Sequence, residues 1–428
     1  MDITKEVIKK AKELGADMVG IAPVERFKGA PLRMSPEGLL PSARSVIVCG
    51  IHHLDASVEL GGEPTPHNKG PYGSQSSVIN PKLDDISFLL ARFLEDRGYT
   101  ALPITASNIW RYNHYKDLKV AFAPDIAHRY AAVAAGLGEI GWSGLFLTRD
   151  FGPRQRVVSI ITDAELIPTQ MYNGPSLCDR CMECVKNCPT DAFRKEVTKI
   201  NEIEIGGKVF KFPDTNKWRC AWAENFGLNL ALKIPEKIDE KVILEYTEKY
   251  GFFSGEEGCC LKFCMVPEKR YYDINYCRAP RRKKDVSVSP EDAWEKIKKI
   301  CSEKDVDICS VETAEFFEKD DTIHPHLHLP DVKSVISIGI QVPGENESNG
   351  EFFWALRRIL NYTAFDIAHY LDISGYSAIT GTNINDILVA EKMGIYKGNR
   401  MFCTILTSAN LGKGMFFRKV KETKNISK

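Results

Sequence analysis

Four cysteines within eleven residues offer the clearest chemistry in the sequence: Cys178, Cys181, Cys184 and Cys188, the last followed by Pro189. The spacing C-x2-C-x2-C-x3-C-P is that of bacterial ferredoxins, in which the fourth cysteine ligates the other cluster of a two-cluster protein. A structural zinc site would instead need two separated cysteine pairs. The run therefore predicts a [4Fe–4S] module that carries single electrons at low potential.

Two such clusters need eight thiolates, and four further cysteines precede a basic stretch of the chain: Cys220, Cys259, Cys260 and Cys264. By analogy with the ligand exchange of two-cluster ferredoxins, we expect one cluster on Cys178, Cys181, Cys184 and Cys264. The second cluster would use Cys188, Cys220, Cys259 and Cys260. The adjacent pair Cys259-Cys260 departs from the regular C-x-x-C spacing, so its exact pairing stays open. The other five cysteines are scattered and are expected to be small buried residues: Cys49, Cys277, Cys301, Cys309 and Cys403.

Composition narrows the class of protein. The 428 residues contain 57 Lys plus Arg and 57 Asp plus Glu, so no net charge favours nucleic acid or an anionic membrane. No apolar run is long enough to span a bilayer, and the first residues lack an apolar signal core. Thirteen cysteines without an export signal indicate a reducing compartment, where cysteine clusters more often hold metal than form disulfides. We expect a cytoplasmic protein with no membrane or nucleic-acid partner.

The elements that must position the cysteines follow from hydrophobic periodicity and turn residues. The pattern predicts helices at 7–14, 89–94 and 128–136, strands at 16–22, 45–51 and 157–161, and a loop at 60–80. The C-terminal part repeats the N-terminal part: Leu40–Ile51 recurs as Leu329–Ile340, and Thr162–Leu166 recurs as Thr407–Leu411. Four such blocks recur in the same order, which indicates a duplicated unit. The second copy lacks the glycine-rich elements of the first, so we expect it to be vestigial.

These observations predict four segments of mixed α/β class. Residues 1–175 form an α/β domain, 176–270 a two-cluster ferredoxin-like domain, 271–285 a basic linker, and 286–428 the vestigial repeat. Between the first helices and the cysteines, Gly136-Leu-Gly-Glu-Ile-Gly141 matches the dinucleotide fingerprint G-x-G-x-x-G. That fingerprint must follow a strand and open a helix. Here it follows an alanine-rich helix, and we reject NAD binding.

The stretch His128–Leu145, with the four-cysteine run beyond it, resembles the epoxyqueuosine reductase and reductive dehalogenase superfamily, as does the opening segment Ala11–Ile21. The resemblance covers residues 1 to about 268. It implies a nitroreductase-like domain holding a corrinoid (cobalamin) against the ferredoxin domain, with electrons passing through the clusters to cobalt and then to a substrate. Small residues give a backbone that a flat macrocycle can approach. Equally, they suit a helix packed tightly on a sheet. The candidate corrinoid-binding residues are Ala135, Gly136, Leu137, Gly138, Gly141, Arg154 and Arg156.

The sequence also departs from that superfamily. Where epoxyqueuosine reductases have an acidic proton donor in a Val-Asp-x-Ala-Pro segment, this chain has Val120-Ala-Phe-Ala-Pro124, with Ala121 in the donor's place. Asp125 and His128 are nearby polar residues that could donate a proton.

We therefore expect a cytoplasmic reductase that takes electrons from a donor such as ferredoxin or flavodoxin and acts on a small molecule. The alternative is an electron-transfer or corrinoid-activating protein with no corrinoid of its own.

Overall fold

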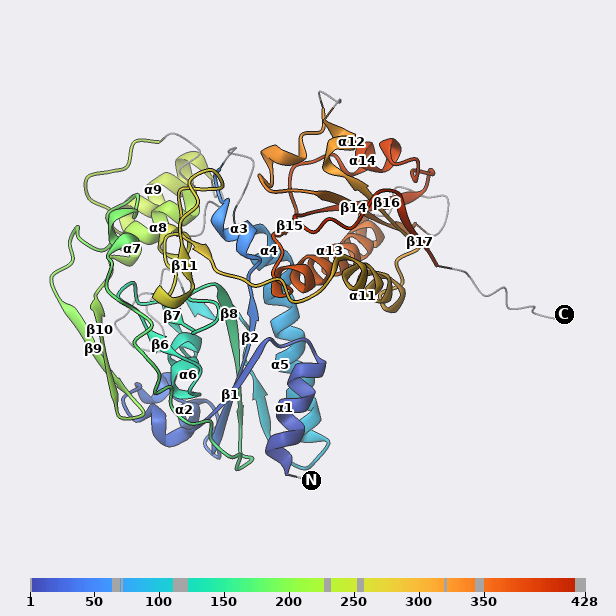
Figure 1. Ribbon diagram of the computed structural model, residues 1–428. Helices are drawn as coiled ribbons and strands as arrows, with labels where there is room; N and C mark the ends of the chain where they lie inside the picture. The colour runs from blue at the N-terminus through green and yellow to red at the C-terminus, as the bar shows by residue number, and fades with distance from the viewer. Residues whose placement is uncertain are drawn as a thin grey trace. The chain divides into compact units, whose positions relative to one another are not determined.

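The computed structural model describes residues 2–63, 70, 72–110, 122–226, 232–251, 258–318, 322–342 and 350–419. The chain divides into two compact units, both of mixed α/β class as predicted (Figure 1). Unit 1 comprises Met1–His53, Gln75–Tyr272 and Ala279–Arg282, and unit 2 comprises Leu54–Ser74, Asp273–Arg278 and Lys283–Lys428. The predicted α/β and ferredoxin-like segments share unit 1, and the boundary between them stays a prediction.

Unit 1 is built on a four-stranded antiparallel sheet. Its strands, in spatial order, are β1 (Met18–Pro23), β2 (Ser45–His52), β8 (Gln155–Thr162) and β3 (Ala101–Pro103). All eight residues of β2 are buried, as expected for a strand covered on both faces.

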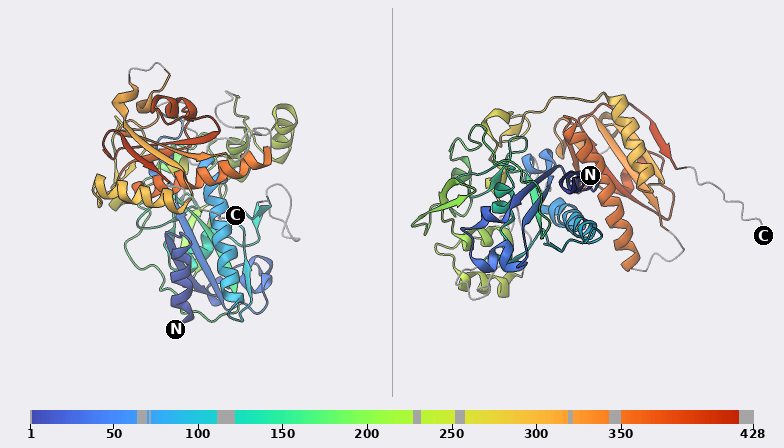
Figure 2. Two further views of the ribbon diagram at one scale, coloured as in Figure 1. Left: turned by 90° about the vertical axis from the view of Figure 1, so that its right-hand side faces the viewer. Right: turned by 90° about the horizontal axis from the view of Figure 1, so that it is seen from below.

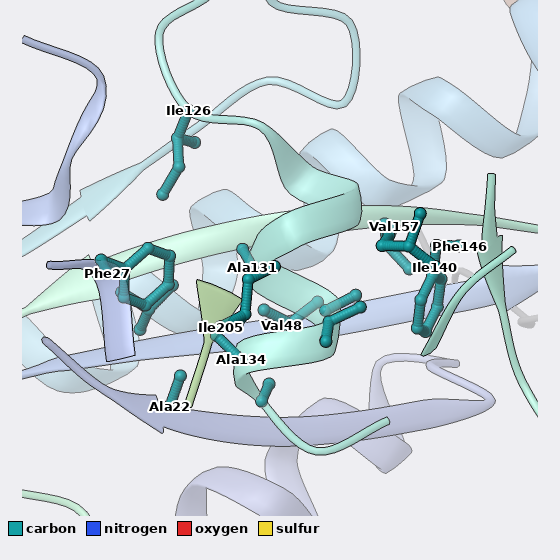
Figure 3. Packing of buried hydrophobic residues seen from close by; sticks show 14 of the residues in the cluster. Ala22, Phe27, Val48, Ile126, Ala131, Ala134, Ile140, Phe146, Val157 and Ile205 are labelled. Carbon is teal, nitrogen blue, oxygen red and sulfur yellow. The ribbon is translucent and has the colours of Figure 1, made fainter. Parts of the chain in front are cut away.

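Three helices cover this sheet. Helix α1 (Ile3–Glu13) and helix α5 (Asn80–Glu95) contact each other and the strands, and Figures 1 and 2 show them on one side of the sheet with α6 (His128–Ala134) on the other. Asp2 caps the N-terminus of helix α1, because its Oδ1 accepts a hydrogen bond of 3.0 Å from Thr4 N. The alanines of α6 pack on β1 and β2 in the main core of unit 1 (Figure 3).

The cysteine-rich part of unit 1 is made of short elements. They are α7 (Glu183–Lys186), β9 (Ile200–Ile205), β10 (Lys208–Pro213), α8 (Lys217–Phe226), α9 (Glu240–Tyr250), α10 (Cys259–Lys262), β11 (Arg270–Tyr271) and β12 (Arg281–Arg282). Smaller elements of unit 1 are η1 (Val24–Phe27), η2 (Leu32–Met34), α2 (Pro36–Leu39), η3 (Gln75–Ile79), β4 (Ile109–Trp110), β5 (Ala123–Pro124), β6 (Glu139–Ile140), β7 (Phe146–Leu147) and η5 (Pro267–Lys269). The predicted loop at 60–80 is partly wrong, because residues 72–79 are helical. Residues 64–69 and 71 lie outside the described part.

Unit 2 has a five-stranded antiparallel sheet. Its strands, in spatial order, are β15 (Ala378–Thr380), β16 (Arg400–Thr407), β14 (Ser334–Gln341), β13 (Ile308–Thr313) and β17 (Met415–Arg418). Its helices are α3 (Asp55–Glu59), α4 (Tyr72–Ser74), α11 (Pro290–Glu303), α12 (Ala314–Phe317), η6 (Pro325–Leu327), α13 (Gly350–Ile373) and α14 (Asp386–Lys392).

A buried ionic group ties helix α3 into unit 2. Lys284 Nζ lies 2.8 Å from Asp372 Oδ1 and 3.4 Å from Asp55 Oδ2. Asp55 N also donates to Asp372 Oδ1 at 3.3 Å. Lys284 belongs to the segment predicted to be a basic linker, and its side chain is only 9% exposed. Its charge is therefore used inside unit 2.

The two sheets have matching registers. Met18 pairs with Gly50 in unit 1 as Ile308 pairs with Gly339 in unit 2. Ser45 pairs with Thr162 as Ser334 pairs with Thr407, and Ala101 and Ala378 pair with these same threonines. The order β1-β2-β8-β3 recurs as β13-β14-β16-β15, with β17 added at one edge. Among the described residues, no helix is long and apolar enough to cross a membrane.

Candidate iron–sulfur site

The thiols predicted to hold the first cluster line one pocket of unit 1. Cys178, Cys181 and Cys184 come from the first motif, and Cys264 comes from the end of the cysteine-rich segment. Within the motif, Arg180 has a φ of 54° and Met182 a φ of 65°, both left-handed. Such turns wrap a short loop around a small volume and aim its thiols inward. The described geometry therefore places together the four thiols assigned to this cluster, and their ligation of iron stays a prediction.

The electrostatics of this pocket suit a bound cation. Burial, and then the charges of Cys178 and Cys181, raise the pKa of Cys184 to about 11. Burial, and then Cys184, Cys178 and Cys181, also raise the pKa of Cys264. Buried thiols that repel one another in the thiolate form need a positive partner to ionise together, and iron supplies it on binding. The donor set therefore fits a [4Fe–4S] cluster.

A second thiol group surrounds Cys260. Burial, and then the charges of Cys220 and Cys188, with smaller effects of Cys184 and Cys264, raise the pKa of Cys260 well above its ordinary value. Helix α10, which carries Cys260, contacts helix α7. Ala192 N donates a hydrogen bond of 3.3 Å to the Sγ of Cys188. Three of the four thiols assigned to the second cluster are thus near one another.

Cys259 is the fourth thiol assigned to that cluster. It is half-buried on α10, directly before Cys260. Successive helical residues point about 100° apart, so the two adjacent thiols leave the helix in different directions. The pairing of Cys259 with the second cluster stays a prediction.

Two arginines that the sequence reasoning missed hold the cysteine loops in place. Arg270 forms a bidentate ion pair with Asp179, Nη1 to Oδ2 at 2.8 Å and Nη2 to Oδ1 at 3.0 Å, and its Nε donates to Met265 O at 3.0 Å. Hydrogen bonding to Arg270 accordingly lowers the pKa of Asp179. This pair fixes the first motif to the residue that follows Cys264. Bidentate pairs of this kind restrict geometry as well as adding energy.

Arg219 plays the corresponding part beside the second group. Its side chain is 1% exposed, and its Nε and Nη2 donate to the two carboxylate oxygens of Glu196 at 2.8 and 2.9 Å. Its Nη1 donates to Thr190 O at 3.2 Å, and its Nη2 also donates to Glu236 O. Arg219 therefore ties the residues after Cys188 to the helix that carries Cys220. Its position directly before Cys220 was the available sequence signal.

The glycine-rich segment after α6 runs into the β6–β7 hairpin. It opens no helix, which agrees with the rejection of dinucleotide binding. Gly136 has a φ of +74°, and a Cβ built on it would lie 2.1 Å from Gln170 O. A Cβ on Gly138 would lie 1.9 Å from Leu147 O, and one on Gly141 would lie 2.8 Å from Leu147 Cδ1. These glycines let the chain pack closely against itself.

The described geometry does not form the predicted macrocycle cradle on the Cβ side of these glycines. The space in front of Gly136 and Gly138 holds backbone carbonyls. Ala135 is fully buried in the core of unit 1, and the half-buried Leu137 packs against it. Of the two interpretations that the sequence left open, a helix packed tightly on a sheet is the one that these residues form.

The two candidate arginines also have protein partners. Arg154 is fully buried, and its Nη2 donates to Pro280 O at 2.7 Å. Arg156 donates from Nε to Asn80 Oδ1 and from Nη2 to Ala106 O, both at 3.2 Å. Neither forms the exposed cation that a phosphate tail would need, so the predicted corrinoid residues do not fit that group.

The two candidate proton donors differ in their surroundings. Burial raises the pKa of Asp125, which favours the protonated form needed for donation. His128 is half-buried, and both ring nitrogens have partners: Nδ1 lies 2.9 Å from Ser159 Oγ and Nε2 lies 2.9 Å from Thr105 O. Burial lowers the pKa of His128 to about 4, so the ring is neutral near pH 7. Ala121 lies outside the described residues.

Comparisons with known proteins agree with the motifs. A family described as "4Fe-4S binding domain" matches residues 174–194. A tetrachloroethene reductive dehalogenase of Desulfitobacterium hafniense is 38% identical over 151 residues, which are 33% of this chain and 24% of that protein. An epoxyqueuosine reductase of Synechocystis sp. is 27% identical over 169 residues, 38% of this chain and 50% of that protein. The chain spans between about a quarter and a half of the length of the curated relatives it matches.

Solved structures of both families are similar to this chain. An epoxyqueuosine reductase crystallised with a modified tRNA-Tyr stem loop has a TM-score of 0.38 at 15% identity, covering 87% of this chain and 82% of that one. A reductive dehalogenase structure has a TM-score of 0.29 at 14% identity, and the match covers 96% of this chain and 60% of that one. Both scores lie below 0.5, and no residue correspondence follows from them. The sequence relatives, named for both families, confirm the resemblance predicted from the motifs.

Proposed function

We propose that the chain is a two-cluster iron–sulfur oxidoreductase that delivers low-potential electrons for the reduction of a small molecule. The observation that carries the proposal is the grouping of the thiols. Cys264 lines the pocket of the first motif, and Cys188 and Cys220 are the strongest charged neighbours of Cys260. This grouping supports the exchanged ligand set that a two-cluster ferredoxin would use.

When bound, the two [4Fe–4S] clusters supply single-electron transfer within a range of about −700 to +450 mV. The protein's part is to hold and shield them. Cys184 and Cys264 come from segments far apart in sequence and meet in a pocket that Leu147 and Met265 partly close with apolar surface. Arg270 and Arg219 keep the loops from spreading.

A corrinoid, which the resemblance implies, is not part of the derived mechanism, because Gly136, Gly138 and Arg154 do not fit it. This observation favours the second candidate function: an electron-transfer or corrinoid-activating protein with no corrinoid of its own. Both functions need a low-potential electron donor such as ferredoxin or flavodoxin, and neither needs nucleic acid. The cytoplasm stays the proposed location, and the matching sheet registers support a proposed internal duplication with a vestigial second copy.

Anaerobic purification followed by iron and sulfide determination tests the main proposal. We expect close to eight irons and eight sulfides per chain, and two electron paramagnetic resonance signals after reduction. Four irons or fewer in fully reconstituted protein would contradict it.

Cobalamin separates the two candidate functions. The protein is incubated with reduced cobalamin, desalted, and its corrinoid content read from absorbance. Retained cobalamin supports a reductase with its own corrinoid, held by residues other than the seven predicted ones. Quantitative loss supports the electron-transfer protein.

A further inference from the structure

The glycine-rich segment has a direct connection to the first cysteine motif. Glu139, in the middle of G-L-G-E-I-G, accepts through Oε2 a hydrogen bond of 3.0 Å from Leu177 N. Three residues later, Trp142 N donates a hydrogen bond of 3.3 Å to the Sγ of Cys178. Gly141, Trp142 and Leu177 line the same pocket as the cysteines. The β6–β7 hairpin therefore forms one wall of the predicted cluster site.

Two opposite electrostatic effects meet at this wall. An N–H group that points at a cysteine sulfur stabilises the more negative, reduced form of a cluster and raises its potential. A carboxylate disfavours the added electron and lowers the potential. The charge of Glu139 is felt nearby, because after burial it is the largest influence raising the pKa of Tyr172.

The way Glu139 is held also matters. Its carboxylate oxygen bonds the backbone N–H of the residue directly before Cys178, so its position relative to the first thiol is restricted. No ion pair of Glu139 is found among the described residues, in contrast to Glu183, which pairs with Lys186 at 2.6 Å. The charge of Glu139 is therefore not offset by a paired cation among the described residues.

We propose that Glu139 is a positioning residue for the first cluster: it holds the backbone at Leu177, and its charge lowers the reduction potential of that cluster. The inference rests on the proposed two-cluster function. The segment that matches the dinucleotide fingerprint would then form one wall of an iron–sulfur site.

The test compares Glu139→Gln with the wild type in a redox titration followed by electron paramagnetic resonance. The amide oxygen of Gln can still accept from Leu177 N, so the variant removes the charge and keeps the hydrogen bond. The signal of the first cluster is assigned by its loss in Cys264→Ala. The control is Glu202→Gln, which removes an exposed carboxylate on β9 that pairs with Lys211 at 2.8 Å.

We expect the midpoint of the first cluster to rise in Glu139→Gln by at least 59 mV, a tenfold change in the reduced-to-oxidised ratio for a one-electron couple. The second cluster and the control should keep their midpoints. An unchanged first midpoint, or an equal rise of both, overturns the proposal.

Glu139→Asp keeps the test decisive if Glu139→Gln fails to assemble the first cluster. If the first cluster assembles in Glu139→Asp and has the wild-type potential, the result supports the role of the charge. If the first cluster assembles in neither variant, the proposed role of the charge is overturned. Wild-type protein without clusters would instead refute the proposed function itself.

Discussion

Alanine in place of Gly136 should destabilise unit 1 by more than alanine in place of Gly394 destabilises unit 2. The two glycines follow equivalent helices, α6 and α14, and have similar φ values of +74° and +67°. A side chain in this left-handed region costs about 1–2 kcal/mol at either position. At Gly136 the new Cβ would also lie 2.1 Å from Gln170 O, so the backbone must shift, at a cost of roughly 1–3 kcal/mol.

The expected losses are therefore about 2–5 kcal/mol for Gly136→Ala and about 1–2 kcal/mol for Gly394→Ala. At Gly394, no heavy atom of the described residues lies within 4 Å of the added Cβ. Pulse proteolysis in increasing urea measures each unit separately when the fragments are resolved by mass. Equal losses in both units would refute the packing argument. A stable Gly136→Ala protein that fails to retain cobalamin would show that this glycine faces a ligand.

Three further predictions address the site. Cys264→Ser should reduce the iron content from about eight to about four per chain and abolish the first cluster's resonance signal, whereas Cys277→Ser, outside both groups, should leave the iron content unchanged. Arg219→Gln should cost about 1–3 kcal/mol in urea unfolding, because the hydrogen bonds of the buried guanidinium to Glu196, Thr190 O and Glu236 O are lost, and should lower occupancy of the second cluster alone. The pKa of His128 is lowered to about 4, so the unfolded state binds more protons than the folded state between pH 4 and 6.5. The free energy of unfolding should therefore decrease by up to about 3 kcal/mol as the pH drops through that window. His128→Gln should make this decrease smaller.

The elements around the site were largely predictable from sequence. The strand expected at 45–51 is β2 (Ser45–His52), and the helix expected at 128–136 is α6 (His128–Ala134). Hydrophobic periodicity and turn residues identify such elements from the local sequence. The structure differs from the prediction only in where these two elements begin and end. The position of Cys264 beside the first motif was also predictable, because the spacing of Cys178 to Cys188 is that of proteins that exchange ligands between two clusters.

What approaches the glycines was not predictable in the same way. The sequence shows that Gly136 and Gly138 leave room, but the groups that use this room, the carbonyls of Gln170 and Leu147, arrive through folding of distant segments. A literal motif and a family resemblance both suggested a ligand there. The burial of Arg154 was not predictable either. The sequence alone does not distinguish a buried arginine that donates to Pro280 O from an arginine on the surface.

The two sheets of matching register differ at one equivalent pair of positions. Ser159 on β8 contacts the neutral ring of His128, and Thr404, at the matching position on β16, has Asp386 beside it, with Thr404 N donating to Asp386 Oδ1 at 2.9 Å. Burial raises the pKa of Asp386, and Arg357 Nη1 lies 3.4 Å from its other oxygen. Each unit therefore has a polar contact between helix and sheet at this position, made by an imidazole in unit 1 and by a carboxylate in unit 2. A contact that either group can make serves the scaffold. This argues that His128 is structural, and Asp125, whose pKa is raised by burial, is the stronger candidate for proton donation.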